Sequence, residues 1–342
     1  MPNKDKTTLN NAILKELSSM ADATASNGAV IPMLTQPPTV YWKIGNEGNF
    51  FAMNVDSITG DKALNGKVIE PTIIFRDEKD DKVIKLENPL FIPLHNSTIW
   101  EKYQEATGDT VTLCASTTSR NGNGVFRYPQ LDVVEKVIYE TGEKLHSKSQ
   151  MYALLTADVA VKGSDKPSPL FKNKLVRVCY NGQVKRESFE EIFKDLTLVT
   201  TTINNELKKH KLSPINFSNL QFGIDTCARM AGGKRNIGFK LKGAKSEYSF
   251  EEAYNAFVVD KDTLINKVVP ALEQVQEFVV ETEIHKVLTC QAFLDKTGTF
   301  PKNADAVQQV LNGNTDSLLI EHDNNNDVPL EVDNGFNDDL PM

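Results

Sequence analysis

The sequence predicts an α+β protein in which a β-rich, barrel-like region precedes a mainly helical region and a disordered acidic tail. Between residues 39 and 129, short runs of β-branched and aromatic residues are separated by turn-forming segments, as is typical of small barrels and sandwiches. From residue 188 onward, apolar residues recur at helical spacing. The last 27 residues hold eight carboxylates and no Lys or Arg, and their few apolar residues cannot offset the entropy lost on ordering.

An N-terminal helix and a linker are expected over residues 1–35. The Thr-Thr pair at 7–8 can cap a helix, and Ile13, Leu14 and Leu17 follow at helical spacing, which predicts an amphipathic helix over 7–25. The stretch ASNGAVIPMLTQPPT then ends the pattern with Gly, Pro and Ser.

The β-rich domain is expected over residues 36–187. TGDKALNGK and RDEKDDK are typical turn segments between its strands. The expected strands are VYWKI, NFFAMNV, KVIEPTIIF, KVIKL and TVTLCAST, followed later by LVRVCYNG at 175–182.

The region expected to be mainly helical spans residues 188–315 and includes a basic loop. Ser188 precedes the first apolar helical pattern, and Ser249 with Glu252 forms a capping box before AYNAFVV. Residues 262–294 show a long apolar period that Pro270 should bend, and PKNADAVQQVLNG predicts a short last helix. Residues 316–342 form the acidic tail.

Charge and hydropathy indicate a cytoplasmic protein of a bacterium or of an infected host cell. No apolar run reaches the roughly 18–20 residues that cross a bilayer, and the N-terminus lacks the continuous apolar segment of a signal peptide. The net charge of −8 comes entirely from the tail, because 38 acidic residues balance 38 Lys and Arg in the rest of the chain. A neutral body of this kind can still bind polyanions locally.

The sequence carries none of the common enzyme signatures. GxxxxGK[ST], GxSxG, HExxH and a GxGxxG motif after a strand are all absent. The four cysteines lie 48 to 65 residues apart, without a CxxC pair, and the five histidines are scattered. We therefore expect no catalytic residues, no metal site and no cofactor.

Three basic segments with aromatic residues indicate a nucleic-acid interface, since such surfaces combine cations for phosphates with rings for bases. In the most basic segment, TCARMAGGKRNIGFKLKGAK at 226–245, the Gly-Gly pair would let the backbone approach a ligand. The same segment also fits a solvated basic loop whose ring packs in the core. The candidate binding residues here are Arg229, Lys234, Arg235, Phe239, Lys240, Lys242 and Lys245.

The other two segments are shorter signals of the same type. Residues 161–186 hold seven Lys or Arg and one Asp, and residues 119–130 place two arginines around two rings beside an Asn-Gly-Asn-Gly turn. Their candidates are Phe171, Lys172, Lys174, Arg177 and Tyr180 in the first, and Arg120, Phe126, Arg127 and Tyr128 in the second.

The last residues of the chain carry the most specific signal. Asp338-Asp339-Leu340-Pro341-Met342 resembles the C-terminal tip of bacterial and phage single-stranded DNA-binding proteins, which end in Asp-Asp-apolar-Pro-aromatic after an acidic, disordered tail. Met342 departs from the usual Phe of that family. The resemblance implies an OB-like barrel in the body and a tip that docks replication or recombination enzymes. An acidic tail that only improves solubility is the alternative.

These patterns together predict a non-catalytic, phage-encoded protein that coats single-stranded DNA in replication or recombination. A nuclease or recombinase subunit without a linear motif, and a viral structural or assembly protein, are the two alternatives.

Overall fold

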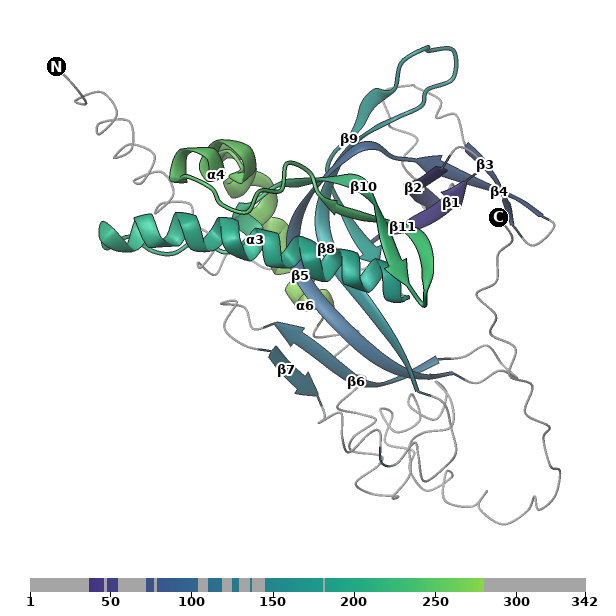
Figure 1. Cartoon of the computed structure of the whole chain (residues 1–342), viewed down its shortest axis with the longest axis horizontal. Coiled ribbons are helices and arrows are strands. Elements are labelled where there is room, and N and C mark those ends of the chain that lie inside the picture. The colour runs from purple at the N-terminus through teal and green to yellow at the C-terminus, as the bar shows by residue number, and fades with distance from the viewer. Residues whose placement is uncertain are drawn as a thin grey trace.

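The structure is a computed structural model, and it describes residues 37–45, 48–54, 72–76, 79–103, 110–118, 125–128, 136, 145–180 and 182–279. The helices predicted over 7–25 and 301–313 and the acidic tail lie outside these residues. Within them, an α+β arrangement is confirmed, because a large mixed sheet packs against one long helix and several shorter ones (Figure 1).

Most of the described strands lie on one hydrogen-bonded path, in the order β11-β10-β5-β8-β9-β1-β2-β4-β3, with β6 and β7 attached to β5. Strands β1 and β9 pair in parallel, and all other neighbours are antiparallel. The strand bounds are β1 Thr39–Gly45, β2 Gly48–Asn54, β3 Thr72–Arg76, β4 Lys79–Lys85, β5 Glu87–Tyr103, β6 Thr110–Thr118, β7 Val125–Tyr128, β8 Leu145–Val159, β9 Ser168–Cys179, β10 Phe222–Ala231 and β11 Lys234–Leu241.

Strand β5 is the centre of the sheet, and the sequence analysis did not predict it. Along one edge it pairs with β8, and along the other it pairs first with β10 and then with β6. It contains Pro89 and Pro93, which normally argue against a central strand. The ladder with β8 shifts register in both places, between Glu87 and Leu90 and between Pro93 and His95. These irregularities accommodate the prolines without breaking the strand.

The sheet is curled but not closed, so the predicted OB-like barrel is not confirmed. Strands β11 and β3 end the hydrogen-bonded path. Strand β11 nevertheless comes close to β2, because the Asn49 side-chain amide donates to the Ile237 carbonyl at 3.4 Å. A side chain therefore bridges these two strands, where a barrel would have a backbone ladder.

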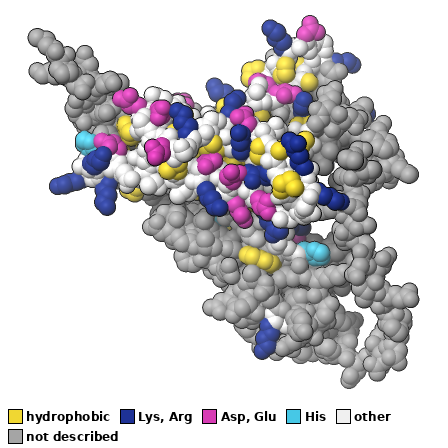
Figure 2. Space-filling view, viewed as in Figure 1, with side chains coloured by type: hydrophobic (Ala, Val, Ile, Leu, Met, Phe, Trp, Pro, Cys, Tyr) yellow, Lys and Arg dark blue, Asp and Glu magenta, His cyan; other side chains and the backbone are white. Residues whose placement is uncertain are grey.

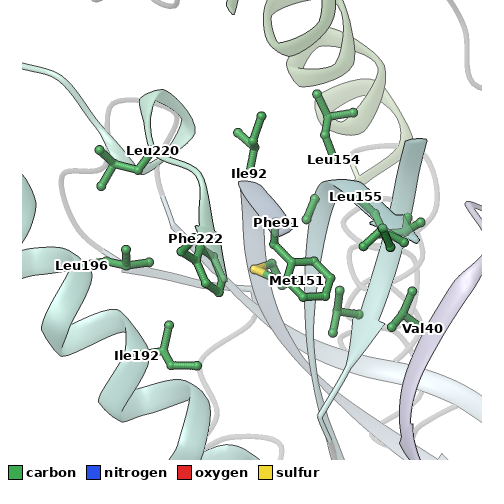
Figure 3. Close-up of a cluster of buried hydrophobic side chains, with 14 of the residues drawn as sticks. Val40, Phe91, Ile92, Met151, Leu154, Leu155, Ile192, Leu196, Leu220 and Phe222 are labelled. Carbon is green, nitrogen blue, oxygen red and sulfur yellow. The ribbon is translucent and has the colours of Figure 1, made fainter. Parts of the chain in front are cut away.

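The long helix α3 (Gln183–Lys209) covers one face of the sheet. Its buried residues recur every three or four positions, so one stripe of the helix faces the core. Figure 3 shows Ile192 and Leu196 on this stripe close to Phe222 of β10, which in turn lies beside Phe91 of β5. The Phe91 and Phe222 ring centroids are 5.8 Å apart.

The shorter helices follow the local signals of the sequence. Helix α4 (Phe250–Phe257) begins at the predicted capping box, in which Ser249 and Glu252 exchange hydrogen bonds of 2.9 and 3.2 Å. Helix α5 (Lys261–Thr263), a π-helical turn (Leu264–Val268) and α6 (Val269–Val279) then follow without a break. The π turn directly precedes Pro270, whose missing N–H rules out a regular hydrogen bond. No helix in the described ranges is long and apolar enough to cross a membrane.

The structure changes the expected division between a β-rich and a helical region. The boundary predicted at 187/188 falls inside α3, which begins at Gln183. The part after it, predicted to be mainly helical, contributes β10 and β11 to the same sheet as β1–β9. Helix α3 and the β10–β11 pair thus contribute to the same hydrophobic core as the strands that precede them.

Candidate nucleic-acid interface

The basic segment 226–245 folds mostly as a β-hairpin, where a loop was predicted. Strands β10 and β11 pair from Ile224 with Leu241 to Ala231 with Lys234. The two residues between them, Gly232 and Gly233, have φ angles of 58° and 76°. Positive φ at both positions is the requirement of a two-residue type I′ turn. The glycines are therefore explained by the turn, and a close approach to a ligand is not needed to account for them.

Helix α3 holds the hairpin through Ser188, a fully buried hydroxyl. Its Oγ accepts a hydrogen bond from the Phe239 N–H at 3.2 Å and donates one to the Val184 carbonyl at 2.7 Å. The two elements approach closely at Gly238, where a Cβ atom would lie 2.7 Å from Ser188 Oγ and 2.6 Å from Arg229 Cδ. Only a residue without a side chain fits here unstrained.

Arg229, predicted to bind nucleic acid, is part of this docking contact. Its guanidinium forms an ion pair with Glu191 of α3 and donates a hydrogen bond to the Phe239 carbonyl at 3.1 Å. The side chain is only 16% exposed. In this structure Arg229 stabilises the hairpin on the helix and presents little of its charge to a phosphate.

Phe239, predicted to stack on a base, is completely buried. Its ring centroid lies 5.0 Å from Trp42, 5.2 Å from Phe51 and 5.0 Å from Phe189. Neither face of the ring is open to a ligand, so the stacking role is corrected. Of the two interpretations of this segment, the structure supports the one in which the ring belongs to the core.

Five of the six cations of the segment remain exposed. Lys245 is paired with Glu252 at 2.9 Å, and this pair together with the Ser249 N–H lowers the pKa of Glu252 to about 2, the Ser249 hydrogen bond being the larger cause. The free end of the hairpin shows basic and apolar side chains next to each other (Figure 2). Besides Lys245, the exposed cations are Lys234, Arg235, Lys240 and Lys242.

The predicted rings of the second segment, Phe171 and Tyr180, also belong to the core, with 2% and 8% of their surface exposed. The Tyr180 ring lies 4.3 Å from Phe189 between centroids, and burial raises the pKa of its hydroxyl. The Arg177 guanidinium donates to Thr39 Oγ1 of β1 at 2.9 Å.

The two lysines predicted in this segment flank Phe171. Lys174 lies over the Phe171 ring at 5.5 Å, while Lys172 is exposed. The second segment therefore supplies cations without an accessible ring.

The third segment lies at another part of the sheet. Phe126, Arg127 and Tyr128 are on β7, which pairs with β6, and β6 pairs with the half of β5 that begins at Ser97. The hairpin pairs with β5 at Leu90 and Phe91, about 20 Å away along the strand at ~3.3 Å per residue. Arg120 and the tip residues Asp338 to Met342 lie outside the described residues. The described part of the third segment thus does not lie beside the hairpin.

A pocket of about 470 Å³ beside the hairpin is the feature that sequence reasoning missed. Its lining comes from five separate stretches of the chain, so no linear motif marks it. The lining residues are Trp42, Asn49, Phe50, Phe51, Lys85, Leu86, Glu87, Asn88, Pro89, Leu90, Gly223, Ile224, Asp225, Thr226 and Lys242. Lys242 is the one predicted candidate among them. The pocket and the cations of β11 together form the candidate interface.

Within the described part of the chain, no group of three or more His, Cys, Asp or Glu side chains could hold a metal ion. Cys179 and Cys227 are free thiols, each half-buried. Comparisons with protein-family models, with curated proteins and with solved structures find no match.

Proposed function

We propose that this protein binds single-stranded DNA without catalysing a reaction, and that the β10–β11 hairpin supplies its main phosphate contacts. The observation that carries the proposal is the charge of this hairpin. From 226 to 245 the chain contains no carboxylate, and five of its six cations stay exposed after folding. A row of cations on a rigid strand pair neutralises backbone phosphates and releases their counterions.

The geometry of β11 supports this role. Alternate residues of a strand face the same side, so Lys234 and Lys240 belong to one side of β11 and Arg235 to the other, and Lys242 follows in the turn directly after the strand. From Lys234 to Lys242 the chain spans about 26 Å. Several consecutive phosphates of an extended strand can therefore be contacted by one element. The proposal needs no closed OB-like barrel, because the hairpin is held by α3 and by the buried Phe239 ring.

The C-terminal tip supports a second part of the proposal, the recruitment of replication or recombination enzymes. A segment that served solubility alone would not need apolar residues beside its carboxylates, and Leu340, Pro341 and Met342 directly follow two carboxylates. The carboxylates would steer the tip to a basic rim, and the apolar residues would enter the slot that the rim surrounds.

The test is a fluorescence-anisotropy titration of labelled single- and double-stranded oligonucleotides at several salt concentrations. Two double charge reversals probe the hairpin, Lys234→Glu with Arg235→Glu and Lys240→Glu with Lys242→Glu. The matched control is Lys261→Glu with Lys267→Glu, which changes the net charge equally on exposed residues of α5 and the π turn.

We expect the wild type to prefer single strands, with an affinity that falls as salt rises. Each hairpin variant should bind more weakly, and its log–log salt dependence should be less steep by about 1.4, or about 0.7 per lost phosphate contact. The control should bind as the wild type does. Equal preference for duplex, or equal losses in the hairpin variants and the control, would refute the proposal. Metal-dependent cleavage of the labelled strand would favour the nuclease alternative.

A further inference from the structure

We infer that the pocket beside the hairpin takes one unstacked nucleobase of the bound strand. This rests on the proposed function and deepens it, because it adds a base contact to a surface that so far contacts phosphates only. The predicted rings Phe171, Tyr180 and Phe239 do not line this pocket.

The pocket exists because β10 pairs with β5 over a short distance only. Phe222 and Gly223 face Phe91 and Leu90 of β5, and beyond this point β10 pairs only with β11. Residues 224–226 of β10 therefore lie along one side of the pocket, with residues 85–90 of the chain on the other. Its volume of about 470 Å³ falls within the range of small-molecule sites.

Apolar and aromatic residues form part of the pocket lining. Trp42 and Phe51 pair across β1 and β2 on one face of the sheet, Phe50 lies on the opposite face, and Trp42 and Phe50 expose 7% and 8% of their surface. Leu90 and Pro89 also line the pocket. The Trp42 and Phe51 rings meet edge to face at 4.8 Å, which holds the indole in a defined orientation. An unstacked base that enters here exchanges water for apolar contact, as bases do in single-strand grooves.

The rim carries the polar groups that the edge of a base requires. Asn49, Asn88 and Asp225 offer amide and carboxylate groups. Along the antiparallel pairing with β11, residues that hydrogen-bond to the partner alternate with residues that do not. Gly223 is of the first kind, because its carbonyl accepts from the Lys242 N–H at 3.0 Å. The main-chain N–H and C=O of Thr226, three residues further on, accordingly point away from β11 and toward the pocket. A base could thus pair with a backbone donor and acceptor.

Two lysines place the phosphates on either side of such a base. Lys85 lies over the Phe50 ring at 5.6 Å and pairs with Glu87 at 2.9 Å, and Lys242 is exposed on the hairpin side. Lys242 is also one of the exposed hairpin cations. A single DNA strand that follows these cations therefore passes the opening of the pocket.

The experiment uses the fluorescence of Trp42 in the full-length chain. The sequence has two tryptophans, so Trp100→Phe leaves Trp42 as the only one. The probes are a single-stranded 12-mer and an abasic 12-mer with the same sugar-phosphate chain, and binding of each is measured separately by anisotropy. In Thr226→Phe, a larger side chain at the rim narrows the pocket without changing a charge, and Thr201→Phe on an exposed position of α3 is its control.

We expect the base-bearing strand to quench Trp42 on binding, whereas the abasic strand should bind about tenfold more weakly and leave Trp42 unchanged. Thr226→Phe should lose the quenching and keep most of the salt-dependent affinity, and Thr201→Phe should behave as the parent does. Equal affinity for both oligonucleotides with an unchanged Trp42 signal would refute the inference that the pocket binds a base, and it would leave the proposed function intact. If neither strand binds, both proposals fail together.

Discussion

Replacing Phe239 with Ala tests the central correction made by the structure, that this ring stabilises the fold and does not contact DNA. The ring is completely buried and lies within 5.2 Å of three other aromatic rings, measured between centroids. Truncation of a buried Phe to Ala typically costs about 3–5 kcal/mol, because transfer energy is lost and a cavity remains. Each aromatic pair contributes a further ~0.5–1.5 kcal/mol beyond its buried area, so we expect a value in the upper half of that range. Phe239→Leu keeps much of the volume and should cost clearly less.

The assay is urea denaturation followed by circular dichroism, with the free energy of unfolding taken from the midpoint and the measured slope. Single-stranded DNA affinity is then measured below the transition of each variant. We expect Phe239→Ala to shift the midpoint strongly and to bind DNA as the wild type does, since the exposed cations of the hairpin are retained. A loss of stability below about 1 kcal/mol, together with a tenfold loss of affinity in the folded protein, would show that the ring stacks on DNA and that the reasoning is wrong.

Three further predictions test the hairpin contact, a buried histidine and the tail. Gly238→Ala should destabilise the protein by about 1–3 kcal/mol in the same denaturation assay, because its Cβ would lie within 2.7 Å of Arg229 and Ser188 atoms. Burial lowers the pKa of His95 to about 4 from 6.5. Between pH 6.5 and pH 4 the unfolded chain binds a proton at this histidine that the folded chain does not. The contribution of His95 to stability is therefore complete above pH 6.5 and decreases by up to about 1.4 kcal/mol per pH unit toward pH 4. In His95→Leu the denaturation midpoint should depend less on pH over this range. Deleting residues 316–342 should raise the affinity for single-stranded DNA, most at low salt, because the tethered carboxylates compete with phosphates; unchanged affinity at low salt would show that the tail does not reach the cations.

The elements that the sequence predicted correctly are those with a strong local signal. The strands around VYWKI, NFFAMNV and TVTLCAST are found as β1, β2 and β6, and the capping box of Ser249 and Glu252 begins α4. Alternation and capping depend on residues next to each other in the chain, so they can be recognised without knowledge of the fold.

The elements that were missed depend on distant partners. Strand β5 contains two prolines that the register shifts against β8 accommodate, and these shifts cannot be seen in the sequence of β5 alone. The hairpin was taken for a loop because its exposed end carries cations and glycines, whereas its strand character comes from pairing with β5 and from the contact with α3. The pocket was missed for the same reason, since five separate stretches line it.

The sequence by itself determined which charges the protein carries and where along the chain they lie. It placed the cations in segment 226–245 and the carboxylates in the last 27 residues. Only the tertiary structure decided which side chains of segment 226–245 are exposed to solvent. Helix α3 engages Arg229 through Glu191, and α3, β1 and β2 together bury Phe239, whereas Lys240 and Lys242 of the same segment stay exposed. The physical reason is that a strand presents alternate residues to two sides, while the elements that pack against each side come from elsewhere in the chain.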